Sequence, residues 1–154
     1  MSVPTNKPAP SKEFDEEALL RAAHEAAKHA YAPYSRFTVG AAVLLEDGRV
    51  FSGCNVENVS YGLTNCAERT AIFSAVAASP ALKSGKLTGT KPLPPIRLRA
   101  VAVVNGTGKE CSPCGACRQV MAEFSDGDTV VIYQFAGGTK RMTMPELLPD
   151  GFEF

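Results

Sequence analysis

The stretch Cys66–Ala78, CAERTAIFSAVAA, combines a helix-forming run of small residues with a cysteine and a glutamate at its start. Its spacing predicts a helix that lies close against a sheet or another subunit. The residues that we expect on this close-packing face are Ala71, Ala75 and Ala78. Cys66 and Glu68 stand where a loop enters the helix, and the unpaired backbone N–H groups there favour anionic side chains.

Segments of helical and strand pattern flank this helix. Before it, Phe14–Tyr31 has apolar residues at helical spacing, and Val39–Leu45 and Val50–Gly53 are typical of two antiparallel strands joined by an Asp-Gly turn. After it we expect a strand Arg99–Asn105, a helix Gly115–Phe124, a strand Thr129–Phe135, a short strand Lys140–Thr143 and a helical turn Met144–Leu148. This order predicts an α/β fold in which helices cover a mixed sheet.

The size of the chain fits one domain. It has 154 residues, of which 45% are hydrophobic, enough to build a globular core. Residues 1–13 hold three prolines and no apolar periodicity, which predicts a flexible N-terminal tail followed by a single domain over 14–154. Ser79–Pro95 holds four prolines and is expected to be a surface connection.

The charge balance narrows the classes of partner. Sixteen Lys and Arg residues match sixteen Asp and Glu residues, so the formal net charge is zero. Binding to nucleic acid or to an anionic membrane through overall positive charge is therefore disfavoured. The chain also lacks an apolar run of about 18 residues, and residues 1–13 lack the apolar core of a signal peptide. These features predict a cytoplasmic protein that binds neither nucleic acid nor membrane.

The five cysteines indicate metal or thiol chemistry rather than a disulfide framework, because their number is odd and no secretory signal precedes them. Cys66 together with Cys114 and Cys117 could fill three positions of a tetrahedral zinc site and leave the fourth for water. A redox pair and a closed four-cysteine zinc site are the alternatives, the second with Cys54 or Cys111 as fourth ligand.

Glu68 stands two residues after Cys66. At that spacing a carboxylate can reach a water on the metal and move protons without binding the metal itself. Alone, Glu68 would be an ordinary acid in the first turn of a helix. The combination Cys-Ala-Glu followed by Pro-Cys-x-x-Cys is more specific, because it is the signature of zinc deaminases.

The chain closely resembles the cytidine deaminases, in their small form with three cysteine ligands. The blocks that carry the resemblance run in order from about Phe14 to Phe152: Tyr34–Ala42, Asn55–Asn58, Cys66–Ala71, Pro113–Gln119 and Leu147–Pro149. The resemblance implies a three-layer α-β-α sandwich with a mixed sheet of about five strands. It also implies a homotetramer whose active sites lie at subunit interfaces.

The resemblance assigns roles residue by residue. One zinc ion per chain would be held by Cys66, Cys114 and Cys117, with Glu68 as catalytic proton shuttle. The expected substrate contacts are the ring of Phe37, the side chains of Asn55 and Glu57, Tyr61, the backbone of Ala67, and Phe152. Phe37 would pack on the pyrimidine, and Asn55 and Glu57 would hold the ribose.

Arg69 has a role that a charge count supports. Three thiolates and one Zn²⁺ carry a net charge of −1, which disfavours a hydroxide on the same metal. A guanidinium that donates to the thiolate sulfurs would withdraw part of this charge, and Arg69 directly follows the Cys-Ala-Glu motif. Arg118, which follows Cys117, is the alternative for this task.

The implied reaction is the hydrolytic deamination of cytidine, and of 2′-deoxycytidine, to the uridine nucleoside and ammonia, a step of pyrimidine salvage. A zinc-bound hydroxide would attack C4 while Glu68 carries protons to N3 and to the leaving amine. Three alternatives stay open: a deaminase acting on a pyrimidine antibiotic, a nucleic-acid cytosine deaminase, and a non-enzymatic zinc or thiol-redox domain.

Overall fold

A computed structural model describes residues 13–83 and 94–152 of the chain. Five strands form one mixed sheet of order β2-β1-β3-β4-β5, in which only β3 and β4 run parallel. The strands are β1 Val39–Leu45, β2 Val50–Cys54, β3 Leu98–Asn105, β4 Val130–Phe135 and β5 Gly138–Thr143. The predicted mixed sheet of about five strands is confirmed.

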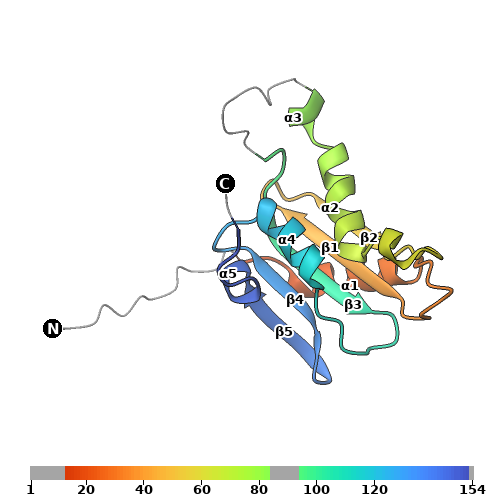
Figure 1. Cartoon of the computed structure of the whole chain (residues 1–154). Coiled ribbons are helices and arrows are strands. Elements are labelled where there is room, and N and C mark those ends of the chain that lie inside the picture. The colour runs from red at the N-terminus through yellow and green to blue at the C-terminus, as the bar shows by residue number, and fades with distance from the viewer. Residues whose placement is uncertain (1–12, 84–93, 153–154) are drawn as a thin grey trace.

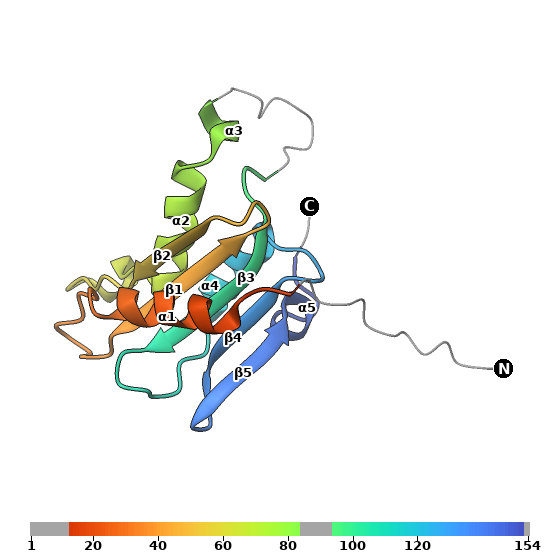
Figure 2. The same cartoon turned by 180° about the vertical axis from the view of Figure 1, so that it is seen from behind.

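Helices cover both faces of this sheet (Figures 1 and 2). On one face, α1 (Glu16–Ala27) packs on Ala42, Ala100 and Val104. On the other, α2 (Ala67–Ala77), α4 (Gly115–Glu123) and α5 (Met144–Leu147) share a larger core with the strands. Because alternate side chains of β3 serve the two cores, the strand is buried on both sides. The expected three-layer α-β-α sandwich is confirmed.

Two glycines let the helices approach the sheet closely. A Cβ atom at Gly40 on β1 would lie 1.9 Å from the carbonyl oxygen of Ala23 on α1. At Gly53 on β2 it would lie 2.5 Å from the backbone nitrogen of Ala71 on α2. Real Cβ atoms do not come so near to backbone, so only glycine fits at these two positions. Gly53 therefore sets the depth at which α2 lies on the sheet.

Local signals explain the ends of several elements. Asp15 caps α1, because its side chain accepts a hydrogen bond from the Ala18 N–H at 2.8 Å. Strands β4 and β5 join through Ala136 and Gly137, which have φ angles of 49° and 77°. Positive φ at both positions is typical of a two-residue hairpin turn that matches the twist of the strands. Strand β5 therefore begins at Gly138, two residues before the predicted Lys140.

Other boundaries differ from the predictions. The helix expected over Phe14–Tyr31 ends at Ala27, where bonds between residues three apart close the last turn, and Tyr31 instead forms a bridge with Val56. Ala78, expected on the close-packing face, is the exposed C-cap of α2. Two short elements were not predicted, the 3₁₀ turn η1 (Tyr61–Leu63) and the helix α3 (Pro80–Lys83).

Two predicted segments fall largely outside the described residues. They are the N-terminal tail, of which only Glu13 is described, and the centre of the connection Ser79–Pro95, residues 84–93. Among the residues that are described, none of the helices is both long and apolar enough to cross a membrane.

Candidate metal centre and active site

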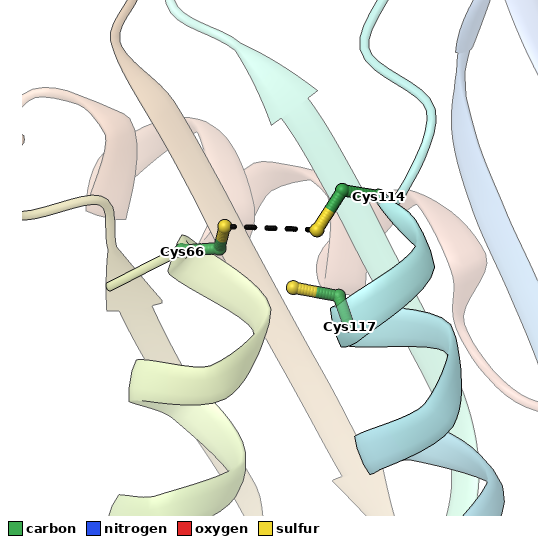
Figure 3. Close-up of side chains that lie close together, drawn as sticks. All are labelled: Cys66, Cys114 and Cys117. Atoms are coloured by element: carbon green, nitrogen blue, oxygen red, sulfur yellow. Dashed lines mark hydrogen bonds between the residues drawn. The ribbon is translucent and has the colours of Figure 1, made fainter. Parts of the chain in front are cut away.

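Three cysteines from two helices converge at one point (Figure 3). Cys66 is the N-cap of α2, Cys114 is the N-cap of α4, and Cys117 lies in the first turn of α4. Their sulfur atoms all lie within 4.8 Å of one another, and those of Cys66 and Cys114 are 3.9 Å apart. Neither N-cap side chain makes a capping hydrogen bond to the backbone of its helix.

This spacing fits a zinc ion. With Zn–S distances of about 2.3 Å, two sulfurs of a tetrahedral site stand about 3.8 Å apart. Helix N-termini also stabilise thiolates, because unpaired N–H groups and the positive end of the helix dipole point at them. The structure thus brings together the three residues that the sequence predicts as ligands, at a spacing that could hold a metal ion.

The pKa values of two thiols in the cluster, those of Cys66 and Cys117, shift in opposite directions. Hydrogen bonding from the Cys117 thiol and from the Arg69 guanidinium lowers the pKa of Cys66 to about 5. The pKa of Cys117 moves in the opposite direction, because its thiol donates to Cys66 and is partly desolvated. The Cys66 thiol therefore loses its proton more readily than the Cys117 thiol, which must give up its proton when a metal binds.

Glu68 is buried beside this cluster, with only 4% of its surface exposed. It occupies the second position of α2, two residues after Cys66. Burial raises the pKa of its carboxyl group to about 7, and the nearby Cys66 thiolate adds to the shift. The structure thus places a carboxyl group that can gain or lose a proton near neutral pH next to the three sulfurs.

The two arginines considered from sequence make different contacts. The Nη2 atom of Arg69 donates to the Cys66 sulfur at 3.3 Å and to the Thr64 carbonyl oxygen at 3.4 Å. Arg118 instead donates to the carbonyl oxygens of Pro113, from Nε at 2.9 Å, and of Leu147, from Nη1 at 3.0 Å. Of the two, Arg69 is the one that reaches a sulfur.

The alternative fourth ligands lie outside the cluster. Cys54 sits at the end of β2, where its thiol donates to the carbonyl oxygen of His29 at 3.3 Å. Cys111 is buried, and burial raises the pKa of its thiol to about 12. Neither belongs to the group of sulfurs within bonding reach of a shared ion. Among the described residues, the cluster therefore offers three sulfur ligands, so that a tetrahedral metal ion held by it would have one position open.

The residues expected to hold the ribose are engaged with the loop that precedes β1. Asn55 is buried, and its amide accepts a hydrogen bond from the Val39 N–H at 2.8 Å and donates to the Phe37 carbonyl oxygen at 2.9 Å. The carboxylate of Glu57 accepts from the N–H groups of Tyr34 and Ser35 and from the Ser35 hydroxyl. These bonds fix the backbone on both sides of Phe37.

The two remaining aromatic candidates are exposed in the isolated chain. Tyr61 in η1 is 77% exposed and meets Tyr34 edge to face, with ring centroids 6.2 Å apart. Phe152 is 68% exposed near the C-terminal end. The structure of one chain therefore does not gather all of the predicted substrate contacts around the three cysteines.

Comparisons with known proteins agree with this geometry. The family profile of the cytidine and deoxycytidylate deaminase zinc-binding region matches residues 13–133. The cytidine deaminase of Halalkalibacterium halodurans is 46% identical over 140 residues, which is 90% of this chain and 95% of the relative.

The chain belongs to the cytidine and deoxycytidylate deaminase family.

Solved structures of this family share the fold. The cytidine deaminase of Burkholderia pseudomallei has a TM-score of 0.70 at 46% identity, and the match covers 90% of this chain and all of that one. The cytidine deaminase of Mycobacterium tuberculosis has a TM-score of 0.70 at 42% identity, covering 92% of this chain and all of that one. The predicted family, its enzymatic nature and its fold are thus confirmed.

Two residues of the family blocks have contacts that the sequence analysis did not predict. Ser35 links the Glu57 carboxylate to the Phe37 N–H, which donates to its hydroxyl at 2.9 Å. Arg118 ties the loop before α4 to α5. A serine two residues before Phe37 is a local signal for such a turn. Nothing in the sequence spacing indicates the bond between Arg118 and Leu147, which are 29 residues apart.

Proposed function

We propose that this enzyme deaminates cytidine, and 2′-deoxycytidine as well, to the corresponding uridine nucleoside and ammonia, as a step of pyrimidine salvage in the cytoplasm. The observation that carries the proposal is the group of three converging sulfurs with a buried carboxyl group beside it, in a chain of this family. The formal net charge is zero, which favours a small-molecule substrate over nucleic acid.

We propose Cys66, Cys114 and Cys117 as the ligands of one zinc ion per chain. When bound, zinc supplies Lewis acidity that makes a water molecule acidic enough to act as a nucleophile at neutral pH. Arg69 lowers the electron density on the Cys66 sulfur through its hydrogen bond at 3.3 Å. It thereby offsets part of the negative charge of three thiolates on one dication.

Glu68 is the proposed catalytic acid and base. Its carboxylate takes the proton that the attacking water gives up and delivers it to N3 of the cytosine ring, so that C4 becomes more electrophilic. It then transfers the second proton of the water to the amino group on C4, which leaves as ammonia. Burial keeps bulk water away from the carboxyl group, so that these protons stay within the site.

The nucleoside contacts are proposed from the loop before β1 and its partners. Phe37 packs on the pyrimidine, and the Ala67 N–H, which lies at the first position of α2, is available to the base edge. Asn55 and Glu57 bind the ribose from the positions that also fix this loop. Because Tyr61 and Phe152 are exposed, we propose that they complete a site shared between subunits of a homotetramer.

The direct test follows the conversion of cytidine and of 2′-deoxycytidine to uridine nucleosides by absorbance, with zinc measured per chain. We expect one zinc per chain and turnover of both substrates. In Glu68→Gln we expect kcat to fall by a factor of roughly 10² to 10⁴ while zinc content stays unchanged, because the proton carrier is lost.

Glu123→Gln is the matched control, since it makes the same chemical change at an exposed position of α4. Its kcat should equal that of the wild-type enzyme. Full activity in Glu68→Gln would refute the role of Glu68. Zinc binding without turnover of either nucleoside would refute the proposed substrate, and a wild-type protein without zinc would refute the metal site.

A further inference from the structure

Arg118 contacts both peptide groups that flank Cys114. Its side-chain Nε donates to the carbonyl oxygen of Pro113 at 2.9 Å, which belongs to the peptide group before Cys114. Its backbone N–H donates to the carbonyl oxygen of Cys114 at 3.0 Å, which belongs to the peptide group after it. The second bond belongs to the backbone of α4, so the peptide plane after Cys114 is held by the helix and the plane before it by the Arg118 side chain.

We infer that Arg118 is a positioning residue that sets where the Cys114 sulfur stands in the zinc site. This inference rests on the proposed metal site and gives Arg118 a task different from that of Arg69. Arg69 donates to a sulfur and changes its charge. Arg118 donates to backbone oxygens and fixes the direction in which the Cys114 side chain leaves the loop.

The side chain of Cys114 has few contacts that would fix its position, so its placement depends on the orientation of its backbone. It is the N-cap of α4, but its side chain makes no capping hydrogen bond to the helix. It is also the exposed member of the cluster, whereas Cys117 is buried. Without the guanidinium, the carbonyl group of the buried Pro113 would lose its bond to the Arg118 side chain, and the Pro113–Cys114 peptide group could rotate.

The same guanidinium extends the support to α5. Nη1 donates to the carbonyl oxygen of Leu147, the last residue of α5, at 3.0 Å. Leu147 is buried in the larger core, and a capping box between Thr143 and Glu146 fixes the start of the helix. The bond to Leu147 therefore holds the Arg118 guanidinium against a well-packed helix. From there the guanidinium can orient the Pro113–Cys114 peptide group.

The test measures how fast the zinc-loaded enzyme releases its metal to a chromogenic chelator under native conditions. We expect Arg118→Ala to release zinc roughly 10 to 100 times faster than wild type, as for other groups that orient metal ligands. Arg118→Lys keeps the charge but replaces the two guanidinium nitrogens that reach separate carbonyl oxygens with one ammonium nitrogen, and its release rate should lie between the two. Arg21→Ala removes an exposed arginine of α1 and serves as control, with a wild-type rate.

Thermal unfolding separates positioning from plain structural support. If Arg118 positions Cys114, the zinc-loaded form of Arg118→Ala loses more Tm than the metal-free form, because weaker metal binding reduces the stabilisation by zinc. Equal losses of Tm in both forms together with a wild-type rate of release would overturn the inference. Should Arg118→Ala not fold, the same comparison on Arg118→Lys decides.

The outcome is distinguishable from a failure of the proposed function. If the wild-type protein binds zinc and deaminates cytidine while both Arg118 variants release zinc at the wild-type rate, the inference about Arg118 alone is wrong. If the wild-type protein binds no zinc, the metal site itself is wrong.

Discussion

At the scale of single residues, Glu68 is a carboxyl group in a place that penalises its charge. Its pKa rises from 4.5 to about 7 because burial desolvates the ionised form. A group whose folded-state pKa is raised stabilises the fold fully below its unfolded pKa, and this contribution is lost as the pH rises through the folded value. Ionised Glu68 should therefore destabilise the metal-free protein at pH 8.

We predict that Glu68→Gln stabilises the metal-free protein more at pH 8 than at pH 4.5. Each pKa unit corresponds to about 1.4 kcal/mol. The gain in unfolding free energy from Glu68→Gln should therefore be about 3 kcal/mol larger at pH 8 than at pH 4.5. Urea denaturation at the two pH values measures it. Glu123→Gln, at an exposed site, should show no such pH dependence. A stabilisation by Glu68→Gln that is equal at both pH values would contradict the prediction.

Ser35 is a second residue whose importance lies in its contacts. Its hydroxyl donates to the Glu57 carboxylate and accepts the Phe37 N–H, so it joins the two residues proposed to bind ribose and base. Arg36, which lies between Ser35 and Phe37 in the chain, has a φ of 57°, a left-handed conformation that these bonds hold in place.

We predict that Ser35→Ala raises the KM for cytidine about fivefold and leaves kcat within a factor of two. The reason is that both hydrogen bonds of the hydroxyl are lost from the binding loop, at about 0.5 kcal/mol for each exposed bond and about 1 kcal/mol together, and none is lost from the reacting groups. Steady-state kinetics gives both constants. Ser74→Ala is the control, because its hydroxyl donates to the Thr70 carbonyl within α2. An unchanged KM in Ser35→Ala would show that substrate binding does not depend on the hydrogen bonds of the Ser35 hydroxyl.

At the scale of elements, the site depends on how α2 and α4 lie on the sheet. Each helix contributes its N-terminus, so a shift of either helix moves a sulfur. The depth of α2 depends on Gly53, where a Cβ atom would meet the backbone of Ala71 at 2.5 Å.

We predict that Gly53→Ala destabilises the protein by about 3 kcal/mol and also lowers zinc occupancy, because α2 is pushed away from β2 together with Cys66. Chemical denaturation and zinc analysis measure the two effects. Gly62→Ala is the matched control, since a Cβ atom there meets no atom within 4 Å. Wild-type stability in Gly53→Ala would mean that the helix can shift without cost.

At the scale of the whole molecule, apolar side chains gather around the loops that precede α2. The exposed members of this group are Tyr31, Tyr34, Val56, Val59, Tyr61 and Leu63. Tyr34 and Tyr61 contact each other, and Tyr31 forms a bridge with Val56, so members of this group from separate segments lie side by side. A surface of this kind is typical of an interface between subunits.

We predict that light scattering gives a mass of four chains for the wild-type protein, and that Leu63→Lys lowers this mass and the activity together. Leu63 is 71% exposed in the single chain, so a lysine there harms an interface rather than the fold. Phe135→Lys, on the hairpin at the opposite edge of the sheet, should keep the wild-type mass. A monomeric and active wild-type protein would contradict the proposed tetramer.

The sequence by itself determined most of the elements of this protein and which cysteines could share a metal ion. Helical and alternating patterns, the Asp-Gly turn and the cysteine spacing act between residues near each other in the chain, so they can be read without a structure. They predicted an α/β fold with helices on a mixed sheet, which is confirmed, and the three cysteines that the structure brings together, while the three layers were implied by the family resemblance.

Only the tertiary structure decided which partner each side chain has. Arg118 directly follows Cys117 and Arg69 is three residues after Cys66, yet it is Arg69 that bonds to a sulfur, while the Arg118 side chain bonds to two carbonyl oxygens. Asn55 and Glu57 meet the loop before β1, about 20 residues earlier in the chain. Such contacts depend on packing between distant segments, and burial in that packing, not the residue type, raises the pKa of Glu68.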